Sequence, residues 1–248
     1  MKKYISIFEL FARNTVYKIL FVLLAMGAAQ ITMFQKAMSE WIPVDYYDLD
    51  FQAIEHYSLE YMVDKSNSPV FMGIAFVLIT AILCWSACNL GSKSSYTLQR
   101  LQVKEKTIFI MQCIYNSLCY VLLLGVQVAV LLVLCGMYVE QSDNVTNQTV
   151  FLAFYRNEFM HSVLPMEGMM RWIVNILILL GCGTSAAVFT YLQRRGKVAW
   201  SLFVVVACVL VGFIQELGGQ LELGTAFSAV IIVALTVYYH VFQKKEDE

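Results

Sequence analysis

One uncharged run limits what this chain can fold into. Between Thr107 and Val139 the sequence has no charged residue. An α-helix needs about 20 apolar residues to cross a hydrocarbon core of about 30 Å. The whole chain is 59% hydrophobic and 14% charged, whereas a soluble domain has about 25% charged residues. We therefore predict an all-α membrane protein, because no water-soluble fold of this size buries so much apolar surface.

Six apolar stretches are candidate transmembrane helices, and we predict a single transmembrane domain over residues 1–248. The stretches are residues 15–35, 69–90, 107–139, 169–192, 198–215 and 223–243. The third stretch is longer than one span requires. We expect one long helix there, tilted or extended past an interface, because Gly125 and Gln127 are too weak a signal for a polar turn between two spans.

The basic residues indicate the orientation of the chain. Six spans place both termini on one side, together with thirteen of the 17 Lys and Arg residues. The other side receives Lys36, Lys65, Arg156 and Arg171. By the positive-inside rule, both termini are expected in the cytoplasm of a multi-pass cell-membrane protein. The net charge of −1 gives no field that would attract nucleic acid, so no nucleic-acid partner is expected.

Three segments outside the spans have helical patterns. Residues 1–14 place Tyr4, Ile7, Phe8 and Phe11 on one face, which predicts an amphipathic elbow helix in the membrane interface; the alternative is a cytoplasmic extension of the first span. Two outer loops cover residues 36–68 and 140–168. In the first, residues 48–63 predict a short interfacial helix, with Leu59 and Met62 facing lipid or the bundle. In the second, residues 151–165 predict an amphipathic or re-entrant element.

The loop between the second and third spans predicts a partner contact. Residues 93–106 favour a short helix whose Tyr96, Leu98 and Leu101 form an apolar ridge beside Arg100. A helix that exposes apolar residues to the cytosol needs a partner groove. The alternative is an interfacial helix lying on lipid.

Neutral polar residues dominate the interior of the predicted spans. Lys18 and Arg171 lie near span ends, and no other charged residue is found inside, which argues against an ion-coupled carrier. Candidates for a translocation path or outer gate are Asn116, Gln127, Gln215 and Glu216. The alternative for such residues is hydrogen bonding between helices.

An enzyme is not expected. Ser185, after Gly183, and His240 resemble the serine and histidine pair of rhomboid intramembrane proteases. However, Ser185 lies in a run of small residues typical of helix packing, and His240 lacks the glycine motif that rhomboids carry. Cys84 and Cys88 are four residues apart, but no histidine or acid lies near them, so packing is favoured over metal binding. We predict no catalytic residue, no metal site and no cofactor in this chain.

A family resemblance combines these features. Residues Ser95 to Lys106 (SYTLQRLQVKEK) lead into Phe109 to Asn116 (FIMQCIYN), and this segment looks like the cytoplasmic loop and third span of Firmicutes-type permeases. With the elbow, six spans and a large first outer loop, the whole chain resembles the membrane subunit of a bacterial type 2 ABC exporter.

The resemblance implies a partner and a mechanism. Tyr96, Leu98, Arg100 and Leu101 would form the coupling helix that docks on a separate ABC ATPase subunit, which would bind ATP and Mg. This sequence has no GxxxxGK[ST] motif of its own. A second permease, either another copy or a sister chain, would complete the pathway for a hydrophobic, amphipathic or peptidic substrate. The main alternative is a non-transporting membrane sensor or assembly module, and a weaker one is a stand-alone carrier.

Overall fold

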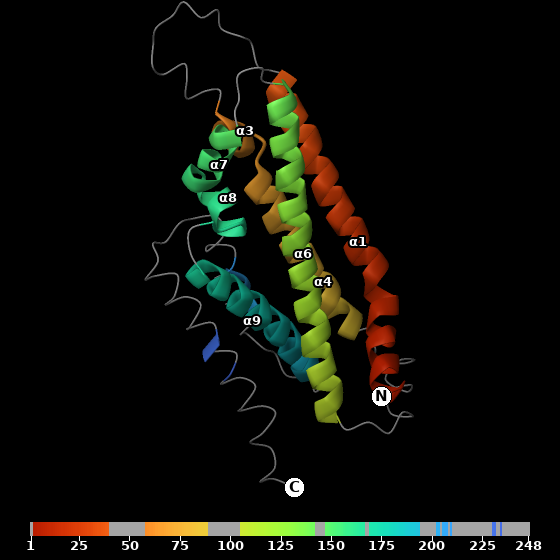
Figure 1. Cartoon of the computed structure of the whole chain (residues 1–248). Helices are drawn as coiled ribbons and strands as arrows, with labels where there is room; N and C mark the ends of the chain where they lie inside the picture. Colours follow the sequence, from red (N-terminus) through yellow and green to blue (C-terminus); the bar gives the residue numbers. More distant parts are fainter. Residues whose placement is uncertain are drawn as a thin grey trace, which may run out of the picture.

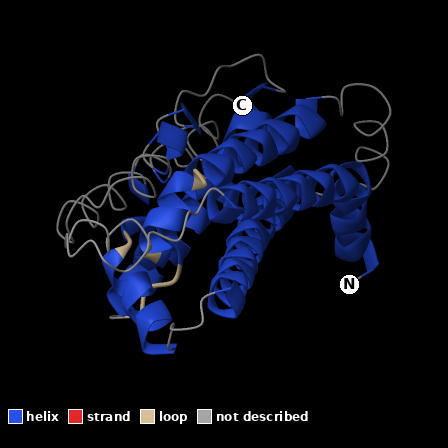
Figure 2. Cartoon of the chain, turned by 90° about the horizontal axis from the view of Figure 1, so that it is seen from above, coloured by secondary structure: helices blue, strands red, loops and turns tan. Residues whose placement is uncertain are grey.

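The computed structural model is helical throughout the part of the chain that it describes. The described residues are 2–39, 58–88, 105–141, 147–166 and 169–193, with 202, 203, 205–207, 209, 230, 231 and 234. Figure 2 draws no strand among them. The described residues agree with the prediction of an all-α chain, and four of the helices are long and apolar enough to cross a membrane.

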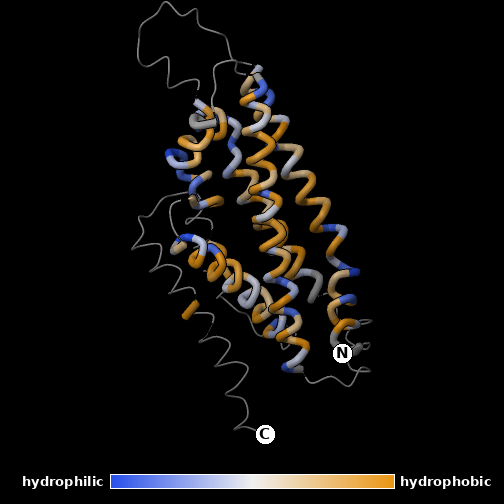
Figure 3. Tube along the Cα trace, in the orientation of Figure 1, coloured by the Kyte–Doolittle hydropathy of each residue, from blue (hydrophilic) through white to orange (hydrophobic). Residues whose placement is uncertain are grey.

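The four candidate spans form a bundle. They are α1 (Lys2–Ser39), α4 (Ser68–Cys88), α6 (Glu105–Gln141) and α9 (Met169–Gln193). They coincide with the first four predicted spans, and Figure 3 shows their predominantly hydrophobic composition. The predicted spans 198–215 and 223–243 lie outside the described residues, apart from a few positions, and remain predictions.

The long third stretch is one helix, as predicted. α6 has 37 residues, which at about 1.5 Å per residue gives a length of roughly 55 Å. The helix passes through Gly125 without a break. It packs against α1, α4 and α9, and Figure 1 shows α9 crossing its lower part obliquely. α6 is therefore the central element of the bundle.

The predicted elbow is not a separate helix. α1 runs without interruption from Lys2 to Ser39, although Figures 1 and 2 show its N-terminal end set at an angle to the rest. Ile7 and Phe11 are buried, and the Phe8 ring lies 5.2 Å from the ring of Tyr115 on α6. The apolar face of this segment thus packs against protein. This favours the alternative, an extension of the first span.

Three short helices from the two predicted outer loops form a cap at one end of the bundle. They are α3 (Leu59–Lys65), α7 (Asn147–Arg156) and α8 (Glu158–Val163), grouped beside the upper ends of the long helices in Figure 1. Leu59 and Met62 are buried against this end of the bundle. The helix predicted over 48–63 is confirmed in its described part. The element predicted over 151–165 is two helices separated at Asn157.

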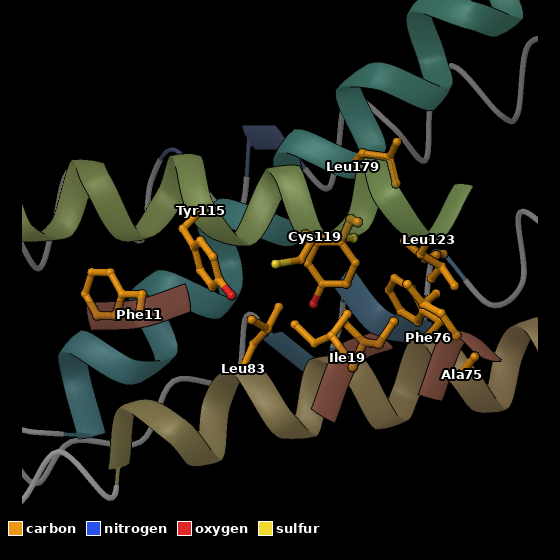
Figure 4. Close-up of a cluster of buried hydrophobic side chains, with 14 of the residues drawn as sticks. Phe11, Ile19, Ala75, Phe76, Leu83, Tyr115, Cys119, Leu123 and Leu179 are labelled. Carbon is orange, nitrogen blue, oxygen red and sulfur yellow. The ribbon is translucent and has the colours of Figure 1, made fainter. Parts of the chain in front are cut away.

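The two largest hydrophobic clusters of the described residues hold the bundle and the cap together. The bundle cluster joins α1, α4, α6 and α9; its members include Phe11, Ile19, Met26, Phe76, Tyr120, Leu123 and Leu179, and Figure 4 shows several of them converging between the helices. The cap cluster joins α3, α7 and α8 to α1, α4 and α6; its members include Phe34, Met38, Leu59, Met62, Leu131, Leu134, Phe154 and Met160. Burial of these side chains fixes the cap on the bundle.

Candidate translocation path

Buried polar side chains occur in the central part of α6, between residues 112 and 127. Gln112, Tyr115, Asn116, Tyr120 and Gln127 are each at most 5% exposed. All five carry amides or hydroxyls. In an apolar interior each such group needs a hydrogen-bond partner, so the partners show what these residues do.

Two amides of α6 are directed at α9. Gln112 Nε2 donates to Thr190 Oγ1 at 2.7 Å, and Asn116 Nδ2 donates to the Gly183 carbonyl oxygen at 3.4 Å. The spacing of four residues places Gln112 and Asn116 on one face of the helix. In this structure both side chains form hydrogen bonds between α6 and α9.

Gly183 allows the backbones of α6 and α9 to come into contact. A Cβ added at this position would lie 2.7 Å from the Ser117 backbone nitrogen and 2.9 Å from the Ser117 Cα. No side chain larger than hydrogen fits there without movement. The small-residue run predicted to serve helix packing does so at this residue.

Two tyrosines of α6 are directed at α1 and α4. The Tyr115 hydroxyl hydrogen-bonds to Thr15 Oγ1 of α1, and Thr15 Oγ1 also donates to the Phe11 carbonyl oxygen at 2.9 Å. The Tyr120 hydroxyl lies 2.9 Å from Thr80 Oγ1 of α4. Their hydroxyl groups therefore join α6 to two further helices.

Gln127 is paired with Gln30 of α1. Gln30 Nε2 donates to Gln127 Oε1 at 3.0 Å, and Gln127 Nε2 donates to Gln30 Oε1 at 3.1 Å. Gln30 Nε2 also donates to the Ser68 carbonyl oxygen at 3.2 Å, which adds the first residue of α4. Sequence reasoning missed Gln30, although a lone amide within an apolar span is a sufficient signal for an interhelical contact.

Of the predicted path residues, Asn116 and Gln127 lie in the described part of the chain, and they contact different helices. Asn116 and Gln127 face α9 and α1 respectively, and each is engaged in a hydrogen bond between helices. Gln215 and Glu216 lie outside the described residues, as do the coupling-helix positions Tyr96, Leu98, Arg100 and Leu101. Their roles remain predictions.

Ser185 is fully buried on α9, and its Oγ has no hydrogen-bond partner among the described residues. His240 lies outside that part of the chain, so the geometry of a serine and histidine pair is untested. Within the described ranges no group of three or more His, Cys, Asp or Glu residues could hold a metal ion.

The charged residues of the cap interact across its helices. Burial raises the pKa of the Glu60 carboxyl above its ordinary value, the nearby Arg156 guanidinium partly offsets this by lowering the pKa, and the Asp64 carboxylate raises it further. Asn157 Nδ2 donates to Asp64 Oδ1 at 3.0 Å. The cap thus combines one partly desolvated carboxyl with a polar contact between α3 and the start of α8.

Comparison with known proteins gives no relative: no family model, no curated protein and no solved structure matches this chain. The residues and contacts above therefore carry the functional argument.

Proposed function

We propose that this chain is the permease subunit of an ATP-driven type 2 ABC exporter. A separate ATPase docks on residues 93–106, and a second permease completes the pathway. The proposal rests on the resemblance of residues 95–116 to permeases of that family and on the four candidate spans.

The observation that carries the proposal is the continuity of α6. The helix begins at Glu105, inside the proposed coupling segment, and continues to Gln141 beside the cap. It contacts α1, α4 and α9 on the way. Because an α-helix is stiff along its axis, a displacement at its first turn is passed to the contacts with all three helices. This is the connection that a docked ATPase requires.

The interior chemistry supports an apolar or amphipathic substrate. The buried polar residues in the described spans carry amides and hydroxyls, and the buried guanidinium nitrogen of Arg171 lies in the first turn of α9. Coupling to protons or sodium ions generally uses a titratable group within the membrane. A neutral interior suits a transporter that takes its energy from a partner's ATP hydrolysis and moves a hydrophobic, amphipathic or peptidic molecule.

The charge distribution supports cytoplasmic termini, and the bacterial cell membrane follows from the resemblance to bacterial permeases. Lys36 lies in the last turn of α1, Lys65 ends α3, Arg156 ends α7 and Arg171 lies in the first turns of α9. Lys36, Lys65 and Arg156 belong to the cap end, whereas α9 begins below α8 in Figure 1. Arg13 and Lys18 of α1 lie toward the N-terminal end. In the proposed orientation the cap faces outward.

Purification tests the proposal directly. The tagged chain is extracted from its native host in mild detergent, and co-purifying proteins are quantified by mass spectrometry. We expect a P-loop ATPase in stoichiometric amount. We also expect the double variant Leu98→Asp with Leu101→Asp to lose it, because two carboxylates on the apolar ridge oppose docking in a groove.

The matched controls are Thr97→Asp and Gln102→Asp, which place the same charge beside the ridge and should retain the ATPase. If the intact chain repeatedly purifies without an ATPase, the exporter proposal is wrong and a sensor or assembly module replaces it. If the Leu98 and Leu101 double variant keeps the ATPase fully coupled, the coupling helix is misassigned.

A further inference from the structure

The Gln30 and Gln127 pair lies between the two hydrophobic clusters. On α1, Met26 belongs to the bundle cluster and Phe34 to the cap cluster, four residues on either side of Gln30. On α6, Leu123 and Leu131 flank Gln127 in the same way. Both amides are 0% exposed. A polar layer therefore separates two apolar layers at one level of the α1 and α6 contact.

This layer is linked to the cap by hydrogen bonds. The Gln30 amide donates to the Ser68 carbonyl oxygen at 3.2 Å. The hydroxyls of Ser66 and Ser68 lie 2.7 Å apart, and Ser66 Oγ donates to the Val63 carbonyl oxygen of α3 at 2.7 Å. Polar contacts thus run from α3 through the start of α4 to α1 and α6. These contacts connect the cap to the amide pair.

Separating the two amides costs less free energy than separating the leucines that flank them. Apolar side chains that part in water lose the whole benefit of burial. Two glutamines that part exchange a protein partner for water, and interhelical hydrogen bonds in membrane proteins are individually weak. The hydrogen-bonded pair therefore holds α1 and α6 together. When water enters, the two helices separate at a small free-energy cost, because water replaces the lost hydrogen bonds.

We propose that the Gln30 and Gln127 pair is the latch of the outer gate. Paired amides keep the cap end of the bundle closed, and the gate opens when α1 and α6 separate at this level and both amides become hydrated. The proposal rests on the proposed transport function and adds the contact that breaks when the path opens.

Native Cys135 is a suitable reporter. It is 6% exposed, lies in the cap cluster and is two turns beyond Gln127 on α6. A sulfonated, membrane-impermeant maleimide added to intact cells reaches it only when the cap end opens. A chain with Cys135→Ala gives the background from the other cysteines, and labelling after denaturation gives the total.

The latch predicts opposite effects of single and double substitutions. Gln30→Leu or Gln127→Leu leaves one buried amide without its partner, which favours the open, hydrated state; we expect Cys135 to react roughly three- to fifteenfold faster. The double variant with leucine at both positions has no amide to hydrate, so its labelling should fall to the wild-type rate or below. Thr80→Val, which removes the hydrogen bond to Tyr120 in the bundle cluster, is the matched control and should leave the rate unchanged.

Unchanged labelling in both single variants overturns the latch, as does a double variant that labels as fast as the single ones. An unfolded variant is recognised by increased labelling in the Cys135→Ala background and by a changed elution volume. If both single variants unfold, the double variant decides: labelling faster than wild type in a folded double variant overturns the latch, and labelling at or below the wild-type rate supports it.

The measurement requires no ATPase, so the two proposals fail separately. If the single variants label faster and no ATPase co-purifies, the latch is supported and the proposal of an ABC ATPase partner is wrong. A co-purifying ATPase with equal labelling in all variants supports the exporter and removes the latch.

Discussion

At the scale of single residues, Gly183 sets the distance between α6 and α9. An added Cβ would lie 2.7 Å from the Ser117 nitrogen, so Gly183→Ala must push the two backbones apart. We expect it to lower the free energy of unfolding by about 1–3 kcal/mol, measured by denaturant titration in detergent. In the control Gly181→Ala, the added Cβ meets no atom within 4 Å. Because alanine is the better helix former, that variant should lose no stability, and an equal loss in both would refute the close contact.

Glu60 gives the cap a pH dependence whose sign follows from its raised pKa. Between the ordinary value of 4.5 and the higher value in the folded state, the folded chain binds more protons than the unfolded chain. The contribution of Glu60 to the free energy of unfolding is therefore largest below pH 4.5 and decreases as the pH rises through this window. Glu60→Gln should remove this decrease. The stability of the variant relative to the wild type should therefore increase between pH 4.5 and pH 7.

Thermal unfolding at the two pH values measures this gain. Glu140→Gln, which removes an exposed carboxyl at the end of α6, is the control for charge loss. A Glu60→Gln variant that gains stability toward acid pH relative to the wild type would show that the sign is wrong.

At the scale of elements, Asn157 connects all three cap helices. Its Oδ1 accepts from the Met160 backbone N–H at 3.0 Å and caps α8, which follows α7 directly, and its Nδ2 donates to Asp64 of α3. The Asn157 and Glu158 sequence is a recognisable helix start. The pattern of residues 151–165 therefore contained the signal for two helices, which the apolar periodicity obscured.

Asn157→Ala should loosen the cap without unfolding the bundle. Loss of the N-cap and of the bond to Asp64 is expected to cost about 1–2 kcal/mol, seen as faster hydrogen exchange in α3 and α8 with unchanged exchange in α6. Asn157→Asp keeps the N-cap acceptor but sets a carboxylate against Asp64, so α3 should exchange faster while α8 stays protected. Equal rates of hydrogen exchange in the wild type, Asn157→Ala and Asn157→Asp would contradict this role of Asn157.

At the scale of the whole molecule, the bundle and the cap divide the charges of the chain. Three of the four basic residues assigned to the outer side, Lys36, Lys65 and Arg156, lie at the cap end, and the positive-inside rule then predicts that the cap faces outward. A reporter that is active only after export, inserted within residues 142–146, should be active, and the same reporter at either terminus should be inactive. The reverse result would invert the proposed orientation.

The all-α class and the first four candidate spans could be predicted from local sequence patterns. The reason is that a hydrocarbon core imposes length and apolarity on each helix separately, so a local pattern is enough to find it. The start of the second span shows the limit of this reasoning. The second span is predicted to begin at residue 69, whereas Ser68 is already helical and the Asn67 carbonyl oxygen accepts the first N–H groups of α4.

Only the tertiary structure decided which polar residues meet. Asn116 and Gln127 have the same local signature, an amide within an apolar span, but one faces α9 and the other pairs with Gln30. Their partners lie 67 and 97 positions away in the sequence. Such pairings depend on how helices rotate and cross when they pack, and the energy of packing is shared among many side chains. The sequence places both amides within a predicted span, and the packing of α6 against its neighbours gives each amide a different hydrogen-bond partner.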